Sequence, residues 1–184
     1  MSIRASRHPL AQRALTTSVI TVAAAACLIA TSAPASAYDA EFRDGDACIG
    51  FKVGLDFGMT NRTSRTFEDK DGNTVVLTTG RAESVVVTND RTKESVTAPA
   101  RGVRTRATTD DNGTADPADD ITTFEVTGNL LLVLFRSDIG GAGLPPSSTT
   151  LIAGRTVFTV NAQGVYIVQS VSGSTTDICE VLAS

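Results

Sequence analysis

The sequence predicts an all-β protein: a single antiparallel β-sandwich or flattened β-barrel of about ten strands, with a possible short C-terminal helical turn. Two observations lead to this class. Short runs rich in Val, Thr, Ile and Phe recur along the chain, and turn signals made of Gly, Asp, Asn and Pro separate them. No run has the apolar period of a long helix or of a helical crossover between parallel strands.

The strands can be placed in chain order. Residues Cys48 to Phe57 alternate between apolar and other side chains, so the first strand is expected there, with one buried face. Asp71-Gly72 predicts a hairpin turn, because glycine tolerates the positive φ that such turns require. The remaining strands are expected at 64–68, 74–79, 82–89, 94–99, 102–109, 121–128, 129–135, 151–160 and 164–173.

Three segments do not follow the alternating pattern. Residues 130–135 are six consecutive apolar residues, which indicates a strand covered on both faces by the tail, a long loop or another subunit. Residues 139–148 are rich in Gly and Pro and are expected to form a loop. In the tail, Asp177 is a candidate helix N-cap because Glu180 follows three residues later.

The N-terminal residues have the features of a secretory signal peptide. Arg4, Arg7 and Arg13 form its basic start, residues 19–30 its apolar run, and Ala35-Ser36-Ala37 its cleavage site. The apolar run is shorter than the roughly 20 residues of a membrane-spanning helix. We therefore expect secretion, with no transmembrane segment after cleavage. The expected parts are a cleaved signal peptide at 1–37, a flexible mature N-terminus at 38–47 and a single all-β domain at 48–184.

Cleavage after Ala37 changes the composition and net charge of the chain. The mature chain has 147 of the 184 residues and a formal net charge of about −7, which disfavours nucleic acid and anionic membranes as partners. Cleavage also removes His8, the only histidine, and Cys27. Cys48 and Cys179 remain, and an even pair in an oxidising compartment predicts a disulfide, the alternative being two free thiols.

The remaining residues exclude several chemistries. Without histidine, neither a histidine-activated nucleophile nor a histidine-based zinc site can form. Paired carboxylates for glycoside hydrolysis are present, but the chain has no Trp, and Tyr166 is the only tyrosine inside the predicted domain. We therefore expect no enzyme, with a histidine-free barrel isomerase or cyclase as the alternative.

An acidic stretch, TTDDNGTADPADD at residues 108–120, is the one candidate metal site. Calcium prefers several carboxylate and carbonyl oxygens, and the spacing around Gly113 partly resembles aspartate-rich calcium repeats. The alternative, which the sequence favours, is a solvated turn at Asn112-Gly113. No other cofactor is expected. The candidate calcium ligands are Asp110, Asn112, Asp116 and Asp119.

Several motifs resemble those of a group of small secreted actinobacterial proteins of unknown function. They are GNLLLVLF at 128–135, TTLIAGRTVFTV at 149–160 and QSVSGSTTDIC at 169–179, together with Cys48 and the DGNT turn at 71–74. The resemblance implies a shared all-β scaffold with one disulfide between the N- and C-terminal parts. It implies no catalytic residue, and the acidic stretch at 108–120 departs from it.

Three functions remain compatible with these observations. The first is a secreted, non-enzymatic β-domain with a binding or structural role, whose partner is an unknown extracellular protein or a small molecule. The second is a small-molecule carrier that uses a barrel interior lined by Gly50, Gly54 and residues 130–135. The third is the histidine-free enzyme. An empty apolar interior favours the carrier, and a filled sandwich favours a module that acts through its surface.

Overall fold

The computed structural model describes residues 38–111, 113, 114 and 116–184 of the chain. The predicted signal peptide and its cleavage site lie outside the described residues. Residues 38–184 belong to one compact unit. Within the described part of the chain, no helix is long and apolar enough to cross a membrane.

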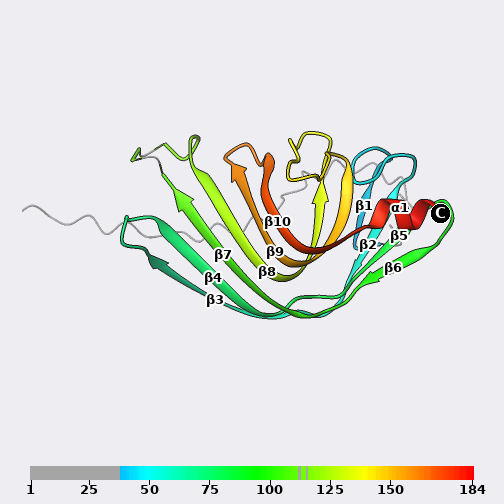
Figure 1. The fold of residues 1–184 in the computed structure, drawn as a ribbon, viewed down its shortest axis with the longest axis horizontal. Coiled ribbons are helices and arrows are strands. Elements are labelled where there is room, and N and C mark those ends of the chain that lie inside the picture. Colours follow the sequence, from blue (N-terminus) through cyan, green and yellow to red (C-terminus); the bar gives the residue numbers. More distant parts are fainter. Residues whose placement is uncertain (1–37, 112, 115) are drawn as a thin grey trace, which may run out of the picture. The chain divides into compact units, whose positions relative to one another are not determined.

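The strands form two antiparallel sheets that pack as a sandwich and do not close into a barrel (Figure 1). This confirms the predicted fold class. The four-stranded sheet has the order β1 (Ala40–Phe42), β2 (Val53–Phe57), β5 (Val85–Asn89) and β6 (Ser95–Ala98). The six-stranded sheet has the order β10 (Tyr166–Asp177), β9 (Ser148–Asn161), β8 (Ile121–Leu134), β7 (Gly102–Asp110), β4 (Thr74–Arg81) and β3 (Asn61–Glu68).

Three chain segments pass from one sheet to the other in the same region, which we call the corner. They are residues 57–61 between β2 and β3, 81–85 between β4 and β5, and 98–103 between β6 and β7. Two of them run as long curved ribbons along one side of the fold in Figure 1. The backbone N–H of Ala82 donates to the carbonyl of Arg101 at 2.9 Å and joins these two segments. Strands that change sheets through such bends are typical of crossed sandwiches.

A row of glycines crosses the six-stranded sheet at one level. A Cβ atom on Gly154 would overlap the carbonyl oxygen of Ser172, and one on Gly128 would overlap that of Gly102. Because four of the five positions at this level have no side chain, the neighbouring backbones approach closely and the strands bend, as Figure 1 shows. This glycine row consists of four glycines and one valine in adjacent strands: Gly80, Val103, Gly128, Gly154 and Gly173.

Two apolar clusters form the core, and β8 lies between them. The first fills the space between the sheets and contains buried side chains of β2, β5 and the C-terminal helix α1 (Ile178–Ala183). The second covers the other face of the six-stranded sheet and includes Leu144 from the 139–148 loop. Leu131 packs against the first cluster, and Leu132 belongs to the second. The prediction that this apolar strand is covered on both faces is therefore confirmed.

The two ends of the domain are held together as predicted. Cys48 and Cys179 form a disulfide with their Cα atoms 5.5 Å apart. Thr149 of β9 donates from its hydroxyl to the carbonyl of Ala47 at 3.0 Å, next to this bond. α1 begins at the predicted N-cap, because the carboxylate of Asp177 accepts from the backbone N–H of Glu180.

Three boundaries differ from those expected. The first long strand begins at Val53 rather than Cys48, because the chain turns at Gly50, where φ is +99°, and leaves Ile49 76% exposed. Residues 38–47, expected to be flexible, contain β1, which pairs with β2 and extends the sheet before Cys48. The expected strands at 121–128 and 129–135 are one strand, β8, because Gly128 bends the chain without ending the strand.

We expect the Cys48→Ala/Cys179→Ala double variant to lose about 4–5 kcal/mol of unfolding free energy, because the bond closes a loop of 131 residues. Urea denaturation measures this loss. Wild-type protein in reducing agent is the control and should match the variant. A loss below about 1 kcal/mol would contradict the entropic role assigned to the bond.

We expect Leu132→Asp and Val133→Asp each to destabilise the domain by several kcal/mol, because each places a carboxylate in one of the two clusters. Thermal unfolding followed by circular dichroism measures the effect. Thr127→Asp, on an exposed position of the same strand, is the matched control. If one of the two variants keeps the wild-type melting temperature, that face of β8 is solvated.

Candidate binding site at the corner

A hollow of about 400 Å³ opens at the corner between the two sheets. Its volume lies in the range of small-molecule sites, about 300–1,000 Å³. Most of the lining side chains are apolar, and they come from both sheets. Those of the four-stranded sheet include Leu55, Val85 and Ala98, and those of the six-stranded sheet include Val103, Val126, Leu130, Leu132 and Phe158.

The hollow exists because β7 and β8 separate. They pair from Asp110–Ile121 as far as Val103–Gly128, at the level of the glycine row. Beyond that point β8 continues beside β9 to Leu134, whereas the chain before Val103 turns through the corner into β6. The space between the diverging segments is the hollow.

This separation leaves one edge of β8 without a neighbouring strand. Among the described residues, positions 129–134 pair only with β9. In an antiparallel pair, alternate residues direct their N–H and C=O groups away from the partner. The lining includes residues 129–133 from both faces of β8, so the hollow extends around this edge. We call positions 129–134 the free edge.

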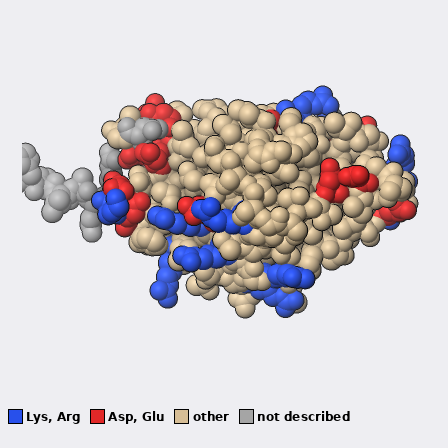
Figure 2. Space-filling model, in the orientation of Figure 1, with Lys and Arg blue, Asp and Glu red and all other residues tan. Residues whose placement is uncertain are grey.

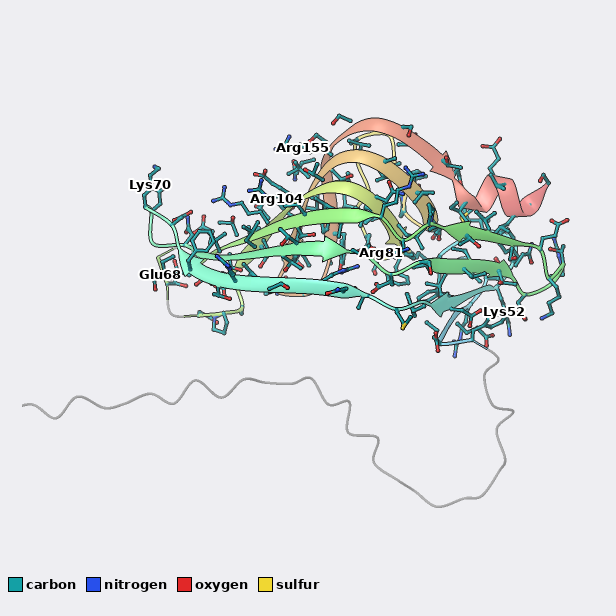
Figure 3. The ribbon with its side chains drawn as sticks, turned by 90° about the horizontal axis from the view of Figure 1, so that it is seen from below. Lys52, Glu68, Lys70, Arg81, Arg104 and Arg155 are labelled. Atoms are coloured by element: carbon teal, nitrogen blue, oxygen red, sulfur yellow. A yellow bond between two sulfur atoms is a disulfide. The ribbon has the colours of Figure 1, made fainter. Side chains whose placement is uncertain are left out.

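The mouth of the hollow combines one ion pair with exposed apolar side chains. The guanidinium of Arg62 lies 3.5 Å from the carboxylate of Glu83, and both residues line the hollow. Phe57, which also lines it, is 46% exposed, and Met59 in the adjoining crossing is 94% exposed. Figure 3 shows Arg81 at the junction of the two sheets, next to this region. Exposed apolar residues beside a hollow are typical of a site that is covered by a ligand.

Stacked aromatic rings form the wall on the second cluster's side. Phe158 and Tyr166 line the hollow with their rings 5.5 Å apart, and Phe124 stacks on Phe158 at 5.0 Å without lining the hollow itself. The buried carboxylate of Asp138 accepts from the backbone N–H groups of Tyr166 and Phe135, at 3.0 and 2.6 Å. Because Asp138 fixes the strand end that carries Tyr166, this wall is preformed.

The acidic stretch lies at the opposite end of the six-stranded sheet from the corner. Figure 2 shows Asp and Glu side chains gathered at the end that holds the β3–β4 and β7–β8 turns. Asp119 accepts from the hydroxyl of Thr114 with both carboxylate oxygens, at 2.9 and 3.1 Å. Asp116 accepts from the backbone N–H of Ala118 at 3.0 Å. Asp110 ends β7, and Asn112 lies outside the described residues.

Within the described residues, no group of three or more His, Cys, Asp or Glu side chains is placed to hold a metal ion. The neighbouring β3–β4 turn has its own internal hydrogen bonds. Loss of solvation raises the pKa of Asp69, but backbone N–H donors from Asn73 and Asp71 outweigh it and hold that pKa below its ordinary value.

Only some of the residues that the alternative carrier hypothesis named lie at the hollow. Residues 130–133 line it. Gly50 and Gly54 do not: Gly50 forms a turn, and a Cβ atom on Gly54 would overlap the ring of Tyr38. The interior is also that of a sandwich and not of a barrel. No local signal in the sequence marks the separation of β7 from β8, which creates the hollow.

Comparisons with protein-family models, curated proteins and solved structures found no match for this chain. The resemblance to small secreted actinobacterial proteins therefore stays a prediction. The candidate site rests on the geometry of the corner alone.

We expect calcium to leave the melting temperature unchanged up to tens of millimolar, well above the dissociation constants of about 0.1–1 mM that weak extracellular sites have. The reason is that the loop's own N–H and hydroxyl groups already occupy carboxylate oxygens of Asp116 and Asp119. Differential scanning calorimetry with calcium, and with magnesium as control, measures this. A bound ion at one hundred times its dissociation constant would stabilise the fold by about 2.7 kcal/mol, and such a calcium-specific shift would establish the site.

Proposed function

We propose that this protein is an exported, non-enzymatic binding protein and that the corner hollow is its ligand site. The observation that carries the proposal is a preformed space of about 400 Å³ whose walls are mostly apolar and belong to both sheets. A space of this kind favours burial of an apolar ligand, since each Å² of apolar surface removed from water contributes about 25 cal/mol.

The ionisable groups of the hollow support binding over catalysis. Arg62 and Glu83 are the charged residues of its lining, and they pair with each other at the mouth. A general acid or base needs a side chain placed against a reacting atom with a pKa suited to the task. Because Arg62 and Glu83 neutralise each other, the rim of the hollow can accept an apolar or a polar end of the ligand.

Export is supported by two independent features. The N-terminal residues carry the signal-peptide pattern, and the described domain contains a disulfide, a bond that persists in oxidising compartments. The proposed ligand is therefore one that is encountered outside the cytoplasm.

The experiment is a titration with N-phenyl-1-naphthylamine, a neutral apolar dye that fluoresces when it leaves water. We expect wild-type protein to bind it and Thr105→Phe, which fills the hollow, to bind at least about tenfold more weakly, or about 1.4 kcal/mol. The matched control is Thr127→Phe, on an exposed position outside the hollow. Equal binding by the two variants, or no binding by the wild type of either this dye or the apolar peptides described below, would overturn the proposal.

A further inference from the structure

We infer that the ligand is an extended, uncharged apolar peptide segment that adds to the free edge of β8 as a new strand. The inference rests on the proposed function, because it places the peptide in the corner hollow. The free edge supplies what a β-strand ligand requires: a row of backbone N–H and C=O groups without a strand partner among the described residues. These groups border the hollow, where a ligand of the right shape can reach them.

The free edge also explains why an apolar ligand without hydrogen-bonding groups fits less well. A hydrocarbon chain in the hollow would cover the N–H and C=O groups of positions 129–134 without satisfying them. Each buried group left without a partner costs about 1–3 kcal/mol. A peptide in the β-conformation presents alternating donors and acceptors at the same spacing, so it satisfies these groups while its side chains fill the hollow.

The two faces of β8 define the side chains of the ligand. Successive side chains of an added strand point to opposite faces of the sheet. On one face they would meet Leu131 and Val133, and on the other Leu130 and Leu132. Because both faces are apolar, the peptide needs apolar side chains at successive positions instead of the alternation of a half-buried strand.

The edge lacks the features that keep other edges from pairing. Natural sheets protect such edges with Lys, Pro or bulges. From Asn129 to Phe135 the chain has no charged residue and no proline, and Arg136 is the first charge. Here the edge is shielded from other sheets by its position inside the corner. The crossing that carries Pro99 and the segment that carries Val85 line the same hollow as the edge. A recessed edge of this kind suits a single inserted strand better than the sheet of a second copy.

The test uses a pool of synthetic peptides, acetylated and amidated. Each has an uncharged segment of five positions drawn from Val, Ile, Leu and Phe, and one Lys at each end that lies outside this segment and keeps the peptide soluble. We expect members of the pool to bind wild-type protein and to lose at least about tenfold in affinity, or about 1.4 kcal/mol, with Thr105→Phe but not with Thr127→Phe. The matched control is each bound peptide with alternate backbone nitrogens methylated, which keeps the side chains and removes the donors. We expect the methylated peptides also to bind at least about tenfold more weakly.

Hydrogen exchange locates the bound peptide. We expect slower exchange for backbone amides within 129–134 when a peptide is bound, and an unchanged rate with the methylated control. Equal affinity for methylated and unmethylated peptides, or protection elsewhere in the domain, would overturn the inference. So would protection of 129–134 that rises with protein concentration alone, because a second copy would then be the occupant.

The two proposals fail in distinguishable ways. If the dye binds in a Thr105-dependent manner and no peptide of the pool binds, the hollow is a ligand site but not for peptides. If neither dye nor peptide binds, both proposals fall.

Discussion

The structure depends on the need to cover β8 on both faces between Leu130 and Leu134. One face packs against the cluster that contains α1 and the four-stranded sheet, and the other against the cluster that contains Leu144. A strand with two apolar faces has to lie inside the protein, since leaving either face in water would forfeit the burial that stabilises the fold. The sandwich, the helix and the 139–148 loop are the elements that provide this cover.

The glycine row is the level at which β8 turns into the core and β7 leaves it. On one side of the row β8 pairs with β7 in a regular ladder, and on the other side the two segments belong to different layers. Without side chains at Gly128 and Gly154, the backbones approach closely enough for the sheet to bend there. The bend directs β8 into the interior while β7 leads away to the corner, and the hollow forms between them. The bend at the glycine row thus both buries β8 and creates the hollow beside it.

Local patterns in the sequence were sufficient to predict the elements but not their long-range arrangement. Alternation, turn residues, the apolar run at 130–135 and the Asp177 cap predicted the fold class, a strand covered on both faces and the start of α1. Gly128 was predicted to end a strand at 121–128, because a glycine that bends a strand and one that ends it look alike in sequence. β1 was missed because a strand of only three residues is stabilised by pairing with β2, a long-range contact without a local signature.

The candidate site was predictable only in part for the same reason. Residues 130–133 line the hollow, a role that only the alternative carrier hypothesis gave them. Their partners at the corner, including Arg62, Glu83 and Pro99, come from segments that the three crossings bring together. The acidic stretch was predicted as a candidate site because of its unusual composition, but it lies away from the hollow. Amino-acid composition predicts which segments are solvated. It does not predict the hollow, because the hollow forms where segments distant in the sequence meet.

The disulfide between Cys48 and Cys179 has a consequence for how the chain is connected. It joins residues 131 positions apart and makes most of the described domain a covalent ring. A protease that cuts an exposed turn, such as the one at Asp71-Gly72, would open the ring without producing two separate fragments. The cut protein would remain one molecule, with new ends at the turn and both sheets still connected through the bridge. The domain can therefore survive a single break in its backbone, a property that suits the exported role proposed above.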